Sequence, residues 1–238
     1  MRLDKLLSHA GYGTRKQVKE LIKNREVSVD NKVITKSNIH IDPERQLIEV
    51  NNQRVDYQKY IYIMLNKPPN YLSATVDRYD KTVLDLIPEK YKHYNLAPVG
   101  RLDKDTEGLL LLTNDGQLNH VLTSPNKKIF KTYFAKIKGI VEEKHIKKFE
   151  KGVILDDGYQ TKEAFLDILK SDTISEIKLS ISEGKFHQVK RMFQAIDMQV
   201  LYLKRTSMGN LSLDKNLSIG EIRLLNESEI TYLQSLKK

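Results

Sequence analysis

Cysteine is absent from this chain of 238 residues. Its absence excludes disulfide bonds, thiolate catalysis and zinc sites built on cysteine, and it fits a reducing compartment, so we expect a cytoplasmic protein. Long apolar runs are also absent, because stretches such as Ile61 to Leu65 are far too short to span a bilayer. The start, from Met1 to Lys5, carries no apolar signal core. We therefore expect neither a signal segment nor a membrane-spanning one.

Basic side chains are in excess, because the chain has 40 Lys and Arg against 31 Asp and Glu, a net charge of +9. Such a surplus favours a polyanionic partner such as nucleic acid or a membrane surface, although an ordinary basic protein would show it as well. Hydrophobic residues make up 39% of the chain, which is enough for a core, and the length suits two domains. The sequence contains no internal repeat and no glycine-rich phosphate loop before a helix.

Two short helices and a hairpin are predicted for residues 1–36. Leu3, Leu6 and Leu7 recur at helical spacing, and Thr14 can cap a second helix together with Gln17. The region holds nine basic and four acidic side chains. A basic helix face suits the phosphate backbone of folded RNA, and a solvated helix face is the alternative. The residues expected to contact RNA here are Arg2, Lys5, Arg15, Lys16 and Lys19.

The order of these residues resembles the small RNA-binding domain named for the fourth small-subunit ribosomal protein. The resemblance covers nearly all of residues 1–45 and rests on Arg2 to Leu7, Gly11, Thr14-Arg15 and Val27 to Asp30. It implies a domain that docks on structured RNA. Residues 51–59 are polar and irregular, which indicates a linker. We therefore expect an RNA-binding domain with its linker at 1–58 and a second domain at 59–238.

The second domain is expected to contain a mixed, mostly antiparallel sheet flanked by helices, so that the whole chain is of the α+β class. Its β-rich runs are short and broken by turns. The predicted strands are Ile61 to Leu65, Gly108 to Thr113, Lys131 to Lys138, Ala164 to Leu169 and Ile174 to Ile181. The predicted helices are Thr82 to Leu86, Gln117 to Leu122, Glu142 to Glu150, His187 to Ile196 and Glu227 to Leu236.

A charged loop runs into a four-leucine strand between Gly100 and Gly116. A loop fixed to a buried strand is a good place to hold a reactive carboxylate. Asp103 to Gly108 copies the first half of a calcium-binding loop, but the position that should carry a bidentate glutamate is Asn114, so we expect no metal. A salt-bridged surface loop is the other alternative to a catalytic one.

Three separated segments resemble one enzyme family together. Gly100 to Asp103 is similar to the signature of the pseudouridine synthases, Lys131-Thr132-Tyr133 to their tyrosine motif, and Glu183 to Met192 to their basic motif. Leu203-Lys204-Arg205 continues the same order. The closest resemblance is to the branch that modifies bacterial ribosomal RNA. It implies isomerisation of uridine without a cofactor, because this reaction needs neither a redox change nor an external group.

The resemblance also implies roles for single residues. Asp103 is the essential carboxylate, Lys190 pairs with it, and Tyr133 stacks on the target base and can accept a proton. Arg101 holds the phosphate of the flipped nucleotide or opens the RNA, since a base inside a helix is out of reach until it is extruded. Asp105 and Glu107 are expected to serve the structure of the loop. Further RNA contacts are expected from Lys185, His187 and Arg191.

Each of three residues also has a purely structural interpretation. Lys190 can be a solvated helix lysine, Tyr133 an aromatic residue packed in a strand, and His187 a structural residue. The short start of the chain is most similar to the enzymes acting on small-subunit (16S) RNA, although large-subunit enzymes share every catalytic motif. We expect a monomer that acts on ribosomal RNA in an assembly intermediate. The alternatives are a large-subunit (23S) RNA synthase, a non-catalytic ribosome-assembly factor, and a metal-dependent nuclease using Asp103, Asp105 and Glu107.

Overall fold

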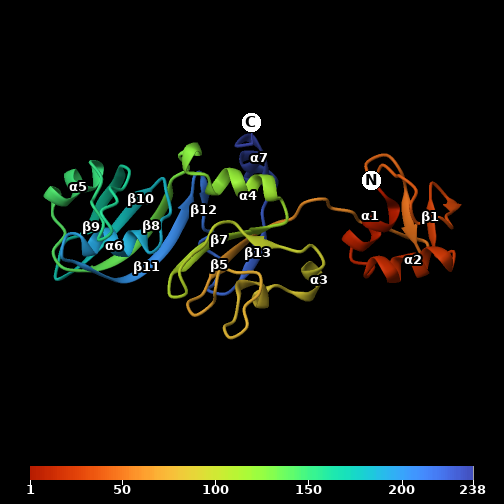
Figure 1. Ribbon diagram of the computed structural model, residues 1–238, viewed down its shortest axis with the longest axis horizontal. Coiled ribbons are helices and arrows are strands. Elements are labelled where there is room, and N and C mark those ends of the chain that lie inside the picture. Colours follow the sequence, from red (N-terminus) through yellow and green to blue (C-terminus); the bar gives the residue numbers. More distant parts are fainter. Residues whose placement is uncertain (238) are drawn as a thin grey trace. The chain divides into compact units, whose positions relative to one another are not determined.

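The computed structural model describes residues 1–237 and divides into two compact units (Figure 1). The first comprises Met1–Ile61 together with Ile87–Asn95, and the second comprises Tyr62–Leu86 and Leu96–Lys238. The segment Ile87–Asn95 lies inside the range expected for the second domain, but it groups with the N-terminal unit. Within residues 1–237, no helix is long and apolar enough to cross a membrane.

The N-terminal unit packs two helices against a small antiparallel sheet. Thr14 caps the second helix as predicted, because its side chain accepts a hydrogen bond from the Gln17 amide while its own amide donates to the Gln17 side chain. Leu3, Leu6 and Leu7 are fully buried in the core. The elements are α1 (Leu3–His9), α2 (Arg15–Lys23), β1 (Val27–Val29), β2 (Lys32–Val33), β3 (Ile48–Val50) and β4 (Gln53–Arg54), with strand order β2-β1-β3-β4.

The interpretation of residues 51–59 as a linker is wrong for its first half. Asn51 and Asn52 have φ values of 52° and 60°, and they form a tight turn that returns the chain as β4 against β3. Asparagine tolerates this left-handed backbone better than most residues, so the pair is a hairpin signal. Val55 then joins the buried core of the unit.

The larger unit contains a mixed sheet with strand order β13-β5-β7-β11-β8-β10-β9, in which β11 and β7 are parallel and the other pairs are antiparallel. Two short strands extend it, since β6 pairs with β7 and β12 with β11. The expected α+β class with a mixed, mostly antiparallel sheet is confirmed. The strands are β5 (Tyr62–Lys67), β6 (Ala97–Pro98), β7 (Glu107–Thr113), β8 (Lys131–Lys138), β9 (Ala164–Lys170), β10 (Ile174–Ile181), β11 (Gln199–Met208), β12 (Leu211–Ser212) and β13 (Ile222–Leu224).

Helices flank this sheet, with α5 packed against β9 and α6 against β11 (Figure 1). The predicted helix at residues 82–86 is a 3-10 turn, and the others begin or end within two residues of the predicted bounds. The helices are η1 (Val83–Leu86), α4 (Gly116–Thr123), η2 (Pro125–Lys127), α5 (Glu143–Glu150), α6 (Gln188–Gln194) and α7 (Glu227–Ser235), and α3 (Glu89–Lys92) belongs to the N-terminal unit.

The register of three strands brings distant segments together. Tyr133 on β8 lies opposite Arg205 on β11, and Arg205 lies opposite Gly108 on β7. Gly108 has φ of 101°, and a Cβ atom there would lie 2.2 Å from the Arg205 carbonyl oxygen. Only glycine permits this approach. The loop that enters β7 is thereby held beside the residues of β8.

Candidate active site

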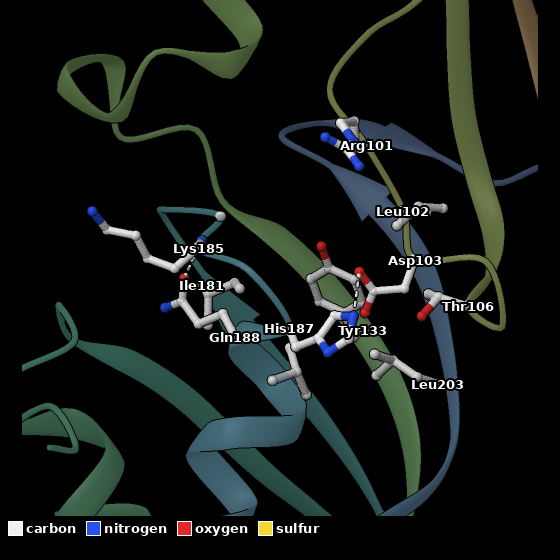
Figure 2. A pocket seen from close by; sticks show the side chains of 12 residues that line it. Arg101, Leu102, Asp103, Thr106, Tyr133, Ile181, Lys185, His187, Gln188 and Leu203 are labelled. Atoms are coloured by element: carbon white, nitrogen blue, oxygen red, sulfur yellow. Dashed lines mark hydrogen bonds and ion pairs between the residues drawn. The ribbon is translucent and has the colours of Figure 1, made fainter. Parts of the chain in front are cut away.

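One pocket in the larger unit is lined by residues from four separate segments of the chain (Figure 2). Arg101 and Asp103 come from the loop before β7, Tyr133 from β8, and Lys185 and His187 from the segment that leads into α6. Leu102, Thr106, Ile181, Gly184, Gln188, Val189 and Leu203 complete the lining. The structure therefore gathers five of the sequence-predicted site residues around one small, open space.

Two basic side chains approach the carboxylate of Asp103. The His187 Nε2 atom lies 3.7 Å from Oδ1, and the Lys190 Nζ atom lies 3.4 Å from Oδ2. The Asp103 side chain is 28% exposed, so it is partly shielded from water yet open to the pocket. A carboxylate in such surroundings is attracted by both neighbours, and His187 contributes a full charge when it is protonated.

Lys190 contacts Asp105 more closely than Asp103. Its Nζ atom donates to both Asp105 carboxylate oxygens, at 2.7 and 2.8 Å. Burial acts to raise the pKa of Asp105, but the hydrogen bonds and charge of Lys190 outweigh it, and that pKa is lowered. Lys190 therefore bridges two carboxylates of the same loop, and Asp105 takes part in the ionic network around Asp103.

The loop that carries Asp103 is fixed by its backbone. The Ser73 hydroxyl donates to the Leu102 carbonyl and accepts from the Leu102 amide, at 2.9 and 3.0 Å. The ammonium group of Lys67 donates to the carbonyls of Pro68, Lys104 and Thr106, at 3.0, 3.2 and 2.9 Å. A loop tied at both ends of its turn positions Asp103 before any substrate arrives.

Lys67 is fully buried, at 0% exposure. Burial lowers its pKa from 10.5 to about 8, against the opposing attraction of Asp105, Asp103 and Glu107. Sequence reasoning missed this residue because it lies just beyond the predicted strand. The sequence did contain a signal for it, because this lysine continues a strand of apolar residues and is followed by two prolines. A lysine in that position is expected to be buried and to form hydrogen bonds within the protein.

Tyr133 is 8% exposed and lines the same pocket as Asp103 (Figure 2). Its planar ring contributes to the lining, and such a ring suits stacking against a base. Arg101 is exposed at the pocket. The pocket therefore combines an aromatic ring, an exposed guanidinium group and the Asp103 carboxylate.

The other predicted RNA contacts have varied surroundings. Lys185 lines the pocket with its Nζ atom 4.4 Å from the centre of the Tyr159 ring. Arg191 does not line it, because its guanidinium group pairs with Asp156 and Asp157. In the N-terminal unit, Arg2 pairs with the buried Asp4 through two hydrogen bonds, whereas Lys5, Arg15, Lys16 and Lys19 are exposed.

Acidic residues are numerous near the pocket, but they do not form a metal site. Among residues 1–237, no group of three or more His, Asp or Glu side chains is arranged to hold a metal ion. Asp105 is instead neutralised by Lys190, and the Tyr202 hydroxyl donates to Glu107 at 2.6 Å. Each of these two carboxylates thus has a partner within the protein.

Comparisons with known proteins give consistent results for the two units. Residues 61–195 match the family described as RNA pseudouridylate synthase, and residues 1–47 match the S4 domain. An uncharacterised RNA pseudouridine synthase of Bacillus subtilis is 47% identical over 98% of each chain. A solved structure titled as a pseudouridylate synthase has 34% identity and a TM-score of 0.69, and the match covers 98% of this chain and 99% of that one.

Relatives named for different ribosomal subunits are equally similar. The large-subunit pseudouridine synthase B of Bacillus subtilis is 39% identical over 99% of this chain and 96% of its own. The small-subunit pseudouridine synthase A of Vibrio parahaemolyticus is also 39% identical, over 97% of this chain and 98% of its own. The pocket built around Asp103 and Tyr133, together with these matches along the whole chain, shows that this protein belongs to the RNA pseudouridine synthase family, whose members isomerise uridine to pseudouridine in RNA.

Proposed function

We propose that this protein isomerises a uridine of 16S ribosomal RNA, with Asp103 as the essential carboxylate. The observation that carries the catalytic assignment is the placement of Asp103 on a braced loop, in one pocket with Tyr133 and beside the basic side chains of His187 and Lys190. The ribosomal substrate is supported by the relatives named for ribosomal subunits. Small-subunit synthases from several bacteria are among them, which is why 16S RNA is the target proposed.

The chemistry moves one base relative to its sugar. The bond between the ribose C1′ atom and uracil N1 breaks, the base turns, and a bond forms between C1′ and uracil C5. The proton on C5 leaves and N1 gains one, so atoms and electrons balance without a cofactor. Asp103 starts this sequence as a nucleophile, either at C1′, where its new bond replaces the bond to N1, or at the uracil ring. The bond that it forms breaks again before the product leaves, which restores the carboxylate, and the neighbouring basic side chains stabilise this carboxylate before attack.

Three other side chains serve the same reaction. The ring of Tyr133 stacks on the uracil and keeps the freed base in the pocket, and its hydroxyl oxygen accepts the C5 proton. Arg101 binds a phosphate of the extruded nucleotide at the open side of the pocket. Lys190 holds Asp103 and Asp105 together, so that two like charges can remain on one loop.

The N-terminal unit supplies affinity for structured RNA. Lys5, Arg15, Lys16 and Lys19 are exposed on its two helices, where they can displace counterions from the phosphate backbone. Arg2 pairs with Asp4, but its side chain is 48% exposed, so it can add to this basic surface. We propose that this unit selects the assembling small subunit, and that the catalytic unit then acts on one uridine within it.

The test is the release of tritium from RNA labelled at uracil C5, because that hydrogen is lost when C5 joins the sugar. Full-length 16S RNA, 23S RNA and small-subunit assembly particles are each incubated with the wild-type protein and with Asp103→Asn. We expect release from 16S RNA or its particles by the wild-type protein, and background release by the variant, which keeps the size of the side chain but cannot form a carboxylate.

The outcomes separate the parts of the proposal. Equal release by both proteins would overturn the role of Asp103. Release from 23S RNA alone would overturn the 16S target while leaving the enzyme assignment in place. Release from particles but not from free 16S RNA would identify the assembly intermediate as the substrate, and release from free RNA alone would contradict it.

A further inference from the structure

Phe186 is exposed at the edge of the pocket. It lies between Lys185 and His187, which both line the pocket, yet its own side chain is not part of the lining and is 74% exposed. An exposed aromatic ring beside a pocket offers apolar area that a bound ligand can cover. This placement is therefore a feature that the reaction at Asp103 leaves unexplained.

The backbone that presents Phe186 is held in place by buried polar groups. Glu183 and Gln188 are each 4% exposed. Gln188 donates to Glu183 at 2.8 Å and accepts from the Lys185 amide at 2.8 Å, and Glu183 also accepts from the Tyr159 hydroxyl at 2.8 Å. The exposure of Phe186 is thus a property of a braced segment, so binding there costs little conformational entropy.

His187 covers one face of the Phe186 ring. The two ring centroids are 3.8 Å apart and the ring planes differ by 18°, so the rings are stacked. His187 has the left-handed φ of 48° at the start of α6, a backbone conformation that most residues avoid. The stack fixes the orientation of Phe186, and the high exposure of the residue leaves its second face open.

We propose that the open face of Phe186 stacks on the nucleobase of the nucleotide next to the extruded uridine. This inference rests on the proposed function, because the extruded uridine itself occupies the pocket with Asp103 and Tyr133. Phe186 lies outside the lining but one residue from His187, whose Nε2 atom is 3.7 Å from the Asp103 carboxylate. The adjacent nucleotide is the part of the RNA that reaches this position.

The charges around Phe186 support a nucleic-acid base rather than a protein segment. Lys185 and Arg101 are exposed on the same pocket, and they attract the phosphates on either side of a bound nucleotide. An exposed aromatic ring at a pocket with basic side chains is a common platform for an unstacked base. Phe186 would therefore be a positioning residue that selects RNA in which the neighbour of the target uridine is unpaired.

The experiment uses the full-length protein and a 16S RNA whose modified uridine has been mapped. The kcat and KM for tritium release are measured for the wild-type protein, Phe186→Ala, Phe186→Leu and Phe186→Trp. Phe165→Ala is the matched control, because Phe165 is a half-exposed aromatic on β9 that contacts Phe130 rather than the pocket. In parallel, 2-aminopurine replaces the base on each side of the target, and its fluorescence reports stacking.

Stacking of a base on an aromatic side chain predicts that Phe186→Ala and Phe186→Leu raise KM by about 5- to 150-fold with a smaller change in kcat. Phe186→Trp should restore KM, and Phe165→Ala should leave it unchanged. The wild-type protein should quench 2-aminopurine at one flanking position, and Phe186→Ala should not. A Leu variant with wild-type KM, or equal quenching by the wild-type and Ala proteins, would overturn the proposal. Failure of the wild-type protein to release tritium would instead refute the proposed function.

Discussion

Replacement of Lys67 by methionine tests whether the Asp103 loop is held by this buried lysine. Methionine has a similar length and no charge, but it leaves the carbonyls of Pro68 and Thr106 without their Lys67 donor. The Lys104 carbonyl also accepts from the Asn70 amide, so it keeps one partner. An orphaned buried acceptor costs about 1–3 kcal/mol. We use about 1.5 kcal/mol for each of the two, in the lower half of this range, because removal of a buried charge is itself favourable. The free energy of unfolding should then fall by about 3 kcal/mol.

For a unit of this size, that loss lowers the melting temperature by roughly 6–12 °C. The effect on catalysis should be larger, because a shift of the loop by about 1 Å costs about 100-fold in rate. The melting temperature is measured by circular dichroism, and kcat by tritium release at a temperature where the variant is folded. Lys178→Met is the control, since Lys178 is an exposed lysine on β10. A Lys67→Met protein with wild-type melting temperature and kcat would refute the reasoning.

Three further predictions concern the pocket and its surroundings. Tyr133→Phe should keep KM and lose most of kcat if the hydroxyl accepts the C5 proton, and unchanged kcat would limit Tyr133 to stacking. Lys190→Met should abolish turnover, because Asp103 and Asp105 lose their shared cation, and near-normal turnover would contradict the pairing. The melting temperature of this variant should fall by less than about 4 °C, as for the loss of an exposed ion pair. Burial, together with Arg205, lowers the pKa of Lys131 from 10.5 to about 8. Between these values the unfolded state binds more protons, so the free energy of unfolding of the wild-type protein should rise with pH relative to Lys131→Met. Chemical denaturation at several pH values measures this difference, and a fall would contradict it.

The parts of the fold that sequence could predict are those with a clear period. Lys131–Lys138 alternates buried and less buried residues, and Ile174–Ile181 does the same, so both strands have the predicted bounds. The capping box at Thr14 could also be predicted, because it depends on two residues at fixed spacing. Local patterns sufficed where local interactions decide the structure.

The long strand β11 was not predicted, although Leu203-Lys204-Arg205 had been noticed as a motif. Its pairing with β8 shifts register between Val200 and Tyr202 and again between Arg205 and Ser207. Each bulge changes which residues face the core, so the strand shows no regular alternation. Such irregular pairing is set by the neighbouring strands and cannot be read from the segment alone.

The candidate site, like the fold, could be predicted from the sequence only in part. Arg101, Asp103, Tyr133, Lys185 and His187 were named from family resemblance, and the structure brings them to one pocket. The contacts that hold them were not predictable, because they run from side chains to backbone carbonyls of remote loops. The contacts of Lys67 with the carbonyls of Lys104 and Thr106 are of this kind. The preference of Lys190 for Asp105 was not predictable either, because it joins side chains that are 85 residues apart in the sequence.

The distribution of rigid and exposed groups indicates where RNA selectivity resides. The Asp103 loop is fixed by Lys67, Ser73 and the close approach of Gly108 to β11, so it offers little freedom for adaptation to different targets. Relatives named for the large and the small subunit are equally similar to this chain, so overall identity does not decide between the two targets. We therefore propose that selectivity comes from groups outside the braced pocket, namely Phe186 at its edge and the exposed lysines of the N-terminal unit. Exchange of these groups between synthases should then change the uridine that is modified while leaving the chemistry intact.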